Sequence, residues 1–343
     1  MLPNSRQKSS LVVNSATGQA GLVSRTREGL DPRLLAVAGA ACISVSAILM
    51  KTSGTSAVTA AVFRCLLALP VLLPLALVER RRRGARPWRR QLVDLAAGVL
   101  LGVDLVLWGY CIGDVGAGIA TVLVNVQVVI VPLLALAVHK ERLSLRFALV
   151  VPVMLLGVAL AAGAVGEPMA GSAPVRGALF GVAAGAAYAG YLFLLRGGAG
   201  ESRHQAQSVG TATVGAGLAA FAIGGAGPGI DLTPGWPALG WLLALALSGQ
   251  VCGWLLISAA LPRLRSNVGA ALLLLQPVLA VLFGVVLLGE RPSGWQLAGC
   301  AVVIAAVWLT SLDRRASRDR DVPVAGVTMA APATGRSDRA AHP

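Results

Sequence analysis

The sequence has little charge. Asp, Glu, Lys and Arg make up 13% of its 343 residues, whereas 56% are hydrophobic, and the mean hydropathy is +0.75. Soluble domains have about 25% charged residues, so this composition excludes an ordinary soluble enzyme or binding module. Whole stretches carry no charge, and apolar runs of about 18 residues or more are typical of transmembrane helices. The chain is therefore predicted to be an all-α polytopic membrane protein.

The sequence also lacks the usual signatures of catalytic and metal chemistry. Its three histidines (His139, His204 and His342) lie outside the apolar runs, and no HExxH, GxSxG or Walker A motif occurs. The five cysteines lie inside apolar runs without CxxC spacing, which predicts buried thiols and no metal site. We therefore expect no cofactor, and an intramembrane enzyme becomes a less favoured alternative.

Ten apolar segments are present, and most can span a hydrocarbon core about 30 Å thick at about 1.5 Å per residue. The Gly and Pro residues within them do not oppose this assignment, because packed membrane helices tolerate both. The flanking residues 1–33 and 312–343 have compositions typical of disordered tails. The segments cover residues 34–50, 57–78, 92–112, 116–138, 146–165, 177–195, 206–225, 238–261, 267–289 and 295–311.

The basic residues predict the orientation. The net charge is +14, and with both termini in the cytoplasm, 25 of the 29 Lys and Arg residues fall in cytoplasmic segments. This distribution follows the positive-inside rule. The run ERRRRGARPWRR at 79–90 then sets the topology and lies near anionic lipid headgroups. The charge therefore indicates a lipid bilayer as the partner, not nucleic acid, and the protein is predicted to reside in an inner or plasma membrane.

Two similar polar stretches indicate an internal repeat. ERLS at 141–144 and ERPS at 290–293 lie 149 positions apart, and the same offset aligns Gln127 with Gln276. Five segments fall in each half, and because five is odd, the second half enters the membrane in the opposite orientation. Inverted repeats of this kind are typical of secondary transporters. The two five-helix repeats are predicted to cover residues 34–165 and 177–311.

The repeated motif itself is interpreted as a turn between helices. Ser144 and Ser293 are placed to cap the helices that follow them. Glu141 and Glu290 each end a helix, where a negative charge opposes the helix dipole. We therefore expect each Glu to have a partner, either its own Arg or the start of an adjacent helix, and we favour this structural role over a gate.

Small residues four apart predict close helix packing at two places. Gly177, Gly181 and Gly185 fall on the sixth segment, and Gly98 and Gly102 on the third. Such spacing lets the backbones of two membrane helices approach each other. Tight packing is favoured over a sliding surface.

Three long runs carry a family resemblance. They are LPRLRSNVGAALLLLQPVLAVLFGVVLLGERPSGWQLAG (261–299), NVQVVIVPLLALAVHKERLS (125–144) and FRCLLALPVLLPLAL (63–77). They resemble the ninth helix, its counterpart in the first half and the second helix of EamA-type members of the drug/metabolite transporter superfamily. One departure is that Val follows Gln127 where Pro follows Gln276, so only the second half has a proline kink there. The resemblance, over about 34–312, implies a ten-helix inverted-repeat fold and transport of small metabolites, often export of amino acids or related compounds.

Two charged residues lie within the predicted spans at similar depth. Charges at membrane depth are costly and need a reason. Because Arg64 and Asp104 lie on neighbouring antiparallel segments, we predict that they form an ion pair or share one substrate. A purely structural salt bridge is the alternative. A paired carboxylate would stay ionised, which opposes simple proton cycling unless the pair separates during transport. Asp94, nearer the inner end of the third segment, is interpreted as interfacial.

Amides and aromatic residues near the midplane complete the predicted site. Amides can hydrogen-bond polar or zwitterionic solutes, and aromatic faces can hold apolar groups or cations. The alternatives are interhelical hydrogen bonds for the amides and interface anchoring for Trp and Tyr. Trp254 and Tyr188 lie too deep for anchoring, so cavity lining is favoured for them. The predicted substrate-binding residues are Asp104, Trp108, Asn125, Gln127, Tyr188, Tyr191, Gln250, Trp254 and Gln276.

These features together predict a secondary transporter that exports a small amino acid-like or amphipathic metabolite. Alternating access would pivot on the two halves, around a site between the third, fourth, sixth, eighth and ninth segments. Coupling to a proton or exchange gradient is left open. A passive channel or facilitator remains an alternative, because it would have the same sequence features.

Overall fold

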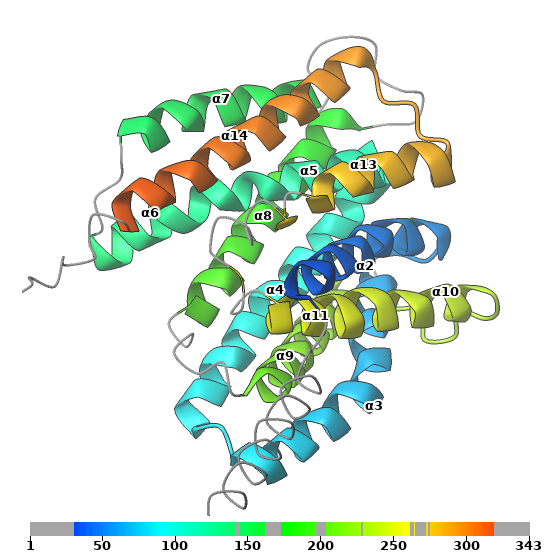
Figure 1. The fold of residues 1–343 in the computed structure, drawn as a ribbon. Helices are drawn as coiled ribbons and strands as arrows, with labels where there is room; N and C mark the ends of the chain where they lie inside the picture. The colour runs from blue at the N-terminus through cyan, green and yellow to red at the C-terminus, as the bar shows by residue number, and fades with distance from the viewer. Residues whose placement is uncertain are drawn as a thin grey trace, which may run out of the picture.

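Every regular element in the described part of the chain is a helix in the computed structural model of the protein (Figure 1). The elements are α2 (Pro32–Thr52), α3 (Ala57–Arg83), α4 (Trp88–Val115), α5 (Ala117–Leu123), η1 (Val124–Val126), α6 (Gln127–His139), α7 (Leu145–Ala161), α8 (Pro174–Arg196), α9 (Gln205–Ala226), α10 (Ala238–Leu245), η2 (Ala246–Gly253), α11 (Trp254–Ala260), α13 (Leu275–Leu288) and α14 (Gly294–Arg318). The structure describes residues 31–140, 145–161, 173–196, 204–227, 229–260, 264, 272–273 and 275–318.

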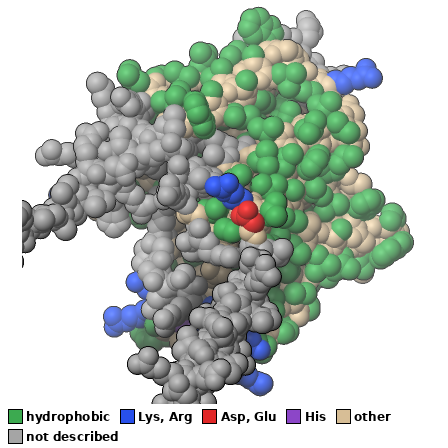
Figure 2. Space-filling view, viewed as in Figure 1, with side chains coloured by type: hydrophobic (Ala, Val, Ile, Leu, Met, Phe, Trp, Pro, Cys, Tyr) green, Lys and Arg blue, Asp and Glu red, His purple; other side chains and the backbone are tan. Residues whose placement is uncertain are grey.

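Seven helical stretches are long and apolar enough to cross a membrane. Three shorter apolar helices, within α7, α13 and α14, fall on the remaining predicted segments. The outer surface of the described residues is correspondingly apolar. Figure 2 shows hydrophobic side chains over most of the coloured part of the view, with Lys and Arg in small scattered groups, one of them beside an Asp or Glu. Leu155, Leu179 and Val286 are among the large apolar side chains that are more than half exposed. This surface is suited to lipid.

Local sequence explains several helix ends. Pro32 opens α2, where a missing N–H is harmless, and the Asp31 side chain caps the helix. Ser293 and Gln296 bond to each other's backbone N–H groups at the start of α14, so the predicted cap at Ser293 is confirmed as a capping box. The helix α14 continues to Arg318, beyond the predicted end at residue 311. Residues 1–30 and 319–343 of the predicted tails, and Glu141 to Ser144, lie outside the described residues.

Two of the predicted spans are interrupted helices. The fourth is made of α5, the 3-10 turn η1 and α6, and the eighth is made of α10, the π-helical segment η2 and α11. A π segment of eight residues is unusual, because π geometry normally appears as single turns inside α-helices and often at functional sites. Both interruptions lie in the middle of their spans, where several predicted site residues are found.

The 149-residue repeat is visible in the helix boundaries. Four helices of the first half begin within one residue of the position that the offset predicts from the second half. The third and eighth spans, for example, begin at Trp88 and Ala238. The other pairs of first residues are Ala57 and Gln205, Gln127 and Leu275, and Leu145 and Gly294.

The packing follows the same relation. Helix α4 packs mainly against α8 and α9, and its counterpart, the α10–η2–α11 span, packs against α2 and α3. The contact of α2 with α13 is mirrored by that of α8 with η1 and α6. The contacts between α3 and α9 and between α7 and α14 each join two equivalent helices, so the exchange leaves them unchanged. In Figure 1, α7 and α14 lie side by side at one edge. Exchanging equivalent helices therefore leaves the pattern of neighbours unchanged.

The two repeats interleave and do not stand side by side. The main partners of α4, α2, α3 and α7 all come from the other repeat. The physical reason is that each repeat leaves apolar faces that only the other repeat covers.

The glycine stripes pack as predicted. A Cβ at Gly98 or Gly102 would meet the backbone of Ala212 or Ala216 on α9. On α8, Cβ atoms at Gly177, Gly181 and Gly185 would meet Val115, Leu123 and Val126 in turn. The glycines therefore bring α4, α8 and α9 into close contact.

Candidate functional site

Arg64 lies at the centre of a polar cluster inside the helix bundle. It belongs to α3 and is 4% exposed. Its Nε donates to Gln250 Oε1 at 3.1 Å, and its guanidinium lies over the Trp108 ring at 5.9 Å from the centroid. A buried cation of this kind needs compensating groups. The structure thus joins three of the predicted midplane residues, from α3, α4 and η2.

The π segment positions Gln250. This side chain is 1% exposed, and its Nε2 donates to Thr213 Oγ1 on α9 at 2.9 Å. A Cβ on the neighbouring Gly249 would lie 3.2 Å from Arg64 Nη2 and 2.8 Å from Ser46 Cβ. The absence of a side chain at 249 therefore lets α2 and Arg64 approach η2. Because both ends of its amide are bonded within the protein, Gln250 holds Arg64 in place.

The cluster spans equivalent positions of the two repeats. Adding the offset of 149 to Arg64 gives Thr213, and Gln250 hydrogen-bonds both residues. Helices α3 and α9 are equivalent and pack against each other. The polar bridge therefore crosses the place where the two repeats meet.

The predicted ion pair between Arg64 and Asp104 is not formed. Asp104, on α4, is 6% exposed, and the two residues lie within electrostatic range. The described ion pairs do not join them, because the Arg64 guanidinium is hydrogen-bonded to Gln250 and lies over the Trp108 ring. Within the described chain, Arg64 Nη1 and Asp104 Oδ1 are buried without a hydrogen-bond partner. One unpaired donor and one unpaired acceptor are thus buried near each other.

Three aromatic residues form a cluster beside these charges. Tyr188 and Tyr191 of α8 stack with centroids 5.7 Å apart. Trp254, the first residue of α11, meets them edge-on with centroids 6.2 and 5.6 Å away. Its Nε1 is buried without an acceptor in the part of the chain that the structure describes. The predicted aromatic residues are therefore brought together, with a polar group available.

The other three predicted amides lie at or beside the η1 interruption and near the start of α13. Asn125 Nδ2 donates to the backbone oxygen of Thr121 at 2.8 Å, which satisfies it locally. Gln127 opens α6, and its Oε1 is buried with no partner among the described residues. Gln276, near the start of α13, accepts through its backbone oxygen from Ser44 Oγ at 2.9 Å. The described hydrogen bonds do not connect these amides to Arg64.

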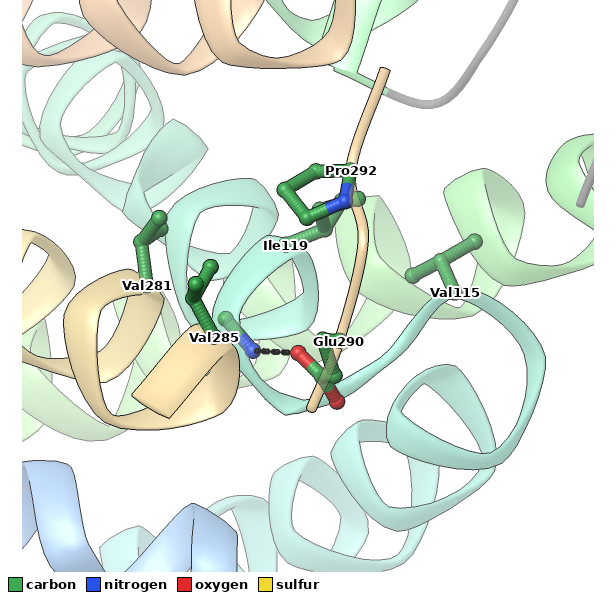
Figure 3. A pocket seen from close by; sticks show the side chains of 7 residues that line it. Val115, Ile119, Val281, Val285, Glu290 and Pro292 are labelled. Carbon is green, nitrogen blue, oxygen red and sulfur yellow. Dashed lines mark hydrogen bonds between the residues drawn. The ribbon is translucent and has the colours of Figure 1, made fainter. Parts of the chain in front are cut away.

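Glu290 joins three helices at one end of the bundle. Its carboxylate accepts from the N–H groups of Ala117 and Gly118 at 2.7 and 3.2 Å and from Lys51 Nζ at 2.7 Å. Figure 3 shows the Glu290 carboxylate beside the first turn of α5, with Val281 and Val285 of α13 close by. A carboxylate is favoured at a helix N-terminus. The predicted partner of Glu290 is therefore confirmed as an adjacent helix start, supplemented by Lys51 at the end of α2.

Comparison with known proteins identifies the family. The model of the EamA-like transporter family matches residues 33–163 and again 175–312. The chain belongs to the EamA-like transporter family. It is therefore a multi-pass membrane transporter of the drug/metabolite transporter superfamily, with two EamA repeats, as the resemblance implied. The two matches agree with the repeats read from the 149-residue offset.

The transporter resembles solved structures in its fold. A crystal structure of a protein superposes with a TM-score of 0.54 at 18% identity, covering 83% of this chain and 98% of that chain. At this identity the likeness shows the fold alone. A search of curated proteins gives no match.

Sequence reasoning missed two ion pairs of the transporter, each with a buried Asp. Arg86 and Asp94 pair at 2.6 Å with side chains 6% and 1% exposed, so Asp94, near the inner end of its span, is buried within the protein. The turn after α3 folds Arg86 back inside, where its N–H also donates to Gln207 of α9. At the other end of α4, Asp114 accepts from Arg176 at 2.6 and 3.0 Å. The sequence signal was that this span has an Asp near each end, Asp94 and Asp114, in addition to Asp104 in its middle.

Proposed function

We propose that this protein is a secondary transporter that exports a small amino acid-like metabolite by alternating access. The buried, incompletely bonded Arg64 guanidinium is the observation that carries the proposal. A cation kept at membrane depth marks a substrate pathway or a counter-ion. Gln250 and Trp108 hold it in place while Nη1 remains available to an anionic group.

The arrangement of charges and rings fits a zwitterion with an apolar side chain. Arg64 Nη1 would donate to the substrate carboxylate, as guanidinium groups favour. Asp104 Oδ1 would accept from the substrate amino group. The cluster of Tyr188, Tyr191 and Trp254 offers aromatic surface for the remainder. Asn125, Gln127 and Gln276 would complete the lining along the interrupted helices.

The moving bodies would combine helices from both repeats. One is α4 with α8 and α9, and the other is the α10–η2–α11 span with α2 and α3, and the exchange of equivalent helices relates them. They meet at α3 and α9, next to the Arg64–Gln250–Thr213 bridge. Rocking about this seam would expose the site to each side in turn, as inverted repeats allow.

The proposed topology has ten spans, with both termini in the cytoplasm of a plasma or inner membrane. The repeats then cover 34–165 and 177–311 in opposite orientations. In this orientation, the Glu290 junction faces the exterior and joins the outer ends of α2, α5 and α13. Cysteine accessibility from outside intact cells tests it: Thr55→Cys should react with a membrane-impermeant reagent, whereas Ala85→Cys should react only after permeabilisation.

Counterflow in proteoliposomes tests the function. Vesicles loaded with each standard amino acid in turn should accumulate the same labelled amino acid, and the rate should saturate with concentration. Arg64→Ala should lose this exchange, whereas Arg33→Ala, an exposed arginine at the start of α2, should keep it. Flux that rises linearly with the gradient, or equal exchange by both variants, would contradict the proposal.

A further inference from the structure

Asp104 differs from the other buried carboxylates of the described chain. Asp94 is neutralised by Arg86, Asp114 by Arg176, and Glu290 by Lys51 together with the start of α5. Asp104 is as buried as these, at 6% exposed. It has no ion pair in the described structure, and its Oδ1 accepts no hydrogen bond there. It is therefore the carboxyl whose negative charge is left without direct compensation.

The elements around Asp104 do not supply a neutralising contact. Helix α3 contributes Arg64, with Cys65 next to it in the chain. The Arg64 Nε donates to Gln250, and its guanidinium lies over the Trp108 ring. From α8 come the phenols of Tyr188 and Tyr191. Helices α5 and α9 contain no titratable residue, and the lysine of α2, Lys51, is paired with Glu290. The charged form of an unpaired carboxyl is strongly disfavoured in such an interior.

We propose that Asp104 is a proton-binding site, and that a proton and the amino group of the substrate compete for its carboxyl. This inference rests on the proposed function for its second half. With the site empty, an O–H bond on Asp104 removes the uncompensated charge. When a substrate ammonium group arrives, it neutralises the carboxylate instead, so the O–H bond breaks and the proton leaves. Arg64 meanwhile binds the substrate carboxylate.

This competition makes the transporter an antiporter. The substrate displaces the proton while the site faces the cytoplasm, so the proton is released there. After the substrate leaves on the outside, Asp104 takes up a proton from that side before the site returns. Each cycle therefore moves one zwitterion out and one proton in. Because the carboxyl is never both unprotonated and empty, uncoupled return is suppressed.

Infrared difference spectroscopy tests the proton site without any substrate. The full chain in lipid vesicles is titrated with acid and base, and the carbonyl stretch of protonated carboxylic acids is followed. We expect the wild type to keep one protonated carboxyl at neutral pH, and Asp104→Asn to lose that band. Asp114→Asn, which removes an ion-paired carboxyl of the same helix, should keep it. A neutral-pH spectrum without the band, or a band that persists in Asp104→Asn, would overturn the inference.

Misfolding and a failed transport function are separated by two further measurements. Asp104→Glu should restore the band, which controls for a folding defect in Asp104→Asn. In counterflow vesicles, an inward proton gradient should drive amino acid out of the wild type and lose this effect in Asp104→Asn. A band at Asp104 without any amino acid exchange would refute the proposed function and spare the proton site. Amino acid exchange without the band would refute the proton site alone.

Discussion

Helix α4 and its counterpart, the α10–η2–α11 span, start from equivalent positions but are built differently. The first is a continuous helix of 28 residues, whereas the second contains the eight-residue π segment η2. The first carries Asp104 and Trp108, whose equivalents by the 149-residue offset are Gly253 and Ile257. The second carries Gln250 and Trp254, whose equivalents are Leu101 and Leu105. None of these four functional positions is duplicated.

The helix arrangement, which we call the frame, follows the repeat, whereas the polar residues of the candidate site do not. Helix boundaries and neighbours follow the repeat, because both copies must bury the same kind of apolar face. The polar residues depart from it, so that each copy supplies a different part of one cluster. Under the proposed function, the symmetric frame would allow two related conformations, and the asymmetric polar residues would form a single site between them. The experiments below test whether each asymmetric position has the role assigned to it.

The largest effect is expected at Arg64 and its equivalent Thr213. Arg64→Ala should abolish amino acid exchange, because it removes the buried cation. Thr213→Ala removes one hydrogen bond to Gln250, typically worth about 1 kcal/mol, so exchange should fall by roughly fivefold. Counterflow rates at matched protein density measure both. Equal losses in the two variants would show that the repeats contribute equally, which contradicts the asymmetric site.

The seam between α4 and α9 should be the next most sensitive. Gly98→Ala places a Cβ against the backbone of Ala212, and strain of this kind typically costs about 1–3 kcal/mol. Gly113→Ala, on the same helix, meets no atom within 4 Å and should be neutral or slightly stabilising. Thermal unfolding in detergent compares them. The equivalent of Gly98 is Leu247, which is 38% exposed, so Leu247→Phe should have little effect on thermal unfolding. A loss of stability as large as that of Gly98→Ala would contradict the difference between the two helices.

A smaller effect is expected where Glu290 joins α5 and α2. Glu290→Gln keeps the size of the side chain but weakens its bonds to Lys51 and to two N–H groups, which should destabilise this end by about 1–2 kcal/mol. Labelling of a cysteine at Val285, beside the junction, should become faster from the outer side. Lys51→Gln should do less, because the lysine is 39% exposed and such pairs are weak. Unchanged labelling in Glu290→Gln would contradict the stabilising role assigned to this carboxylate.

The smallest effect should separate the two functions of Trp254. Trp254→Phe keeps an aromatic face against Tyr188 and Tyr191 but removes the Nε1–H group. If the ring alone matters, the concentration for half-maximal exchange should change by less than about threefold, since under 1 kcal/mol is then lost. Trp254→Leu introduces the residue found at the equivalent position, Leu105, and should raise the concentration for half-maximal exchange further. Equal values for the two variants would show that aromatic character is irrelevant.

Much of the frame could be predicted from the sequence. Long apolar runs located the helices, since each predicted segment overlaps at least one described helix. The offset of 149, found from ERLS and ERPS, also pairs the starts of α6 and α13, at Gln127 and Leu275, to within one residue. The capping by Ser293 and a helix-start partner for Glu290 followed from helix-end physics alone. These features depend on local chemistry and on repetition, which a single sequence displays.

The site was harder to predict because it depends on rotation about the helix axes. Arg64 and Asp104 have similar depth, but depth does not say which side chain each one faces, and Arg64 turns to Gln250. The π segment adds local unwinding that composition does not reveal, and Thr213 and Ser46 look like ordinary small residues. Arg86 was counted with a solvated basic run, although the turn at Gly84 brings it inside against Asp94.

The interleaving of the repeats has a consequence for how the chain is made. Arg64 and its partner Gln250 are separated by 186 positions. At synthesis rates of about 5–20 residues per second, the second partner emerges roughly 10–40 s after the first. During that interval α3 and α4 lie in the membrane without α8, α9 and η2, so Arg64 lacks Gln250 and has Trp108 and Asp104 of α4 beside it. The ion pair that is absent from the finished protein is thus well suited to its assembly, as a temporary contact that the later helices replace.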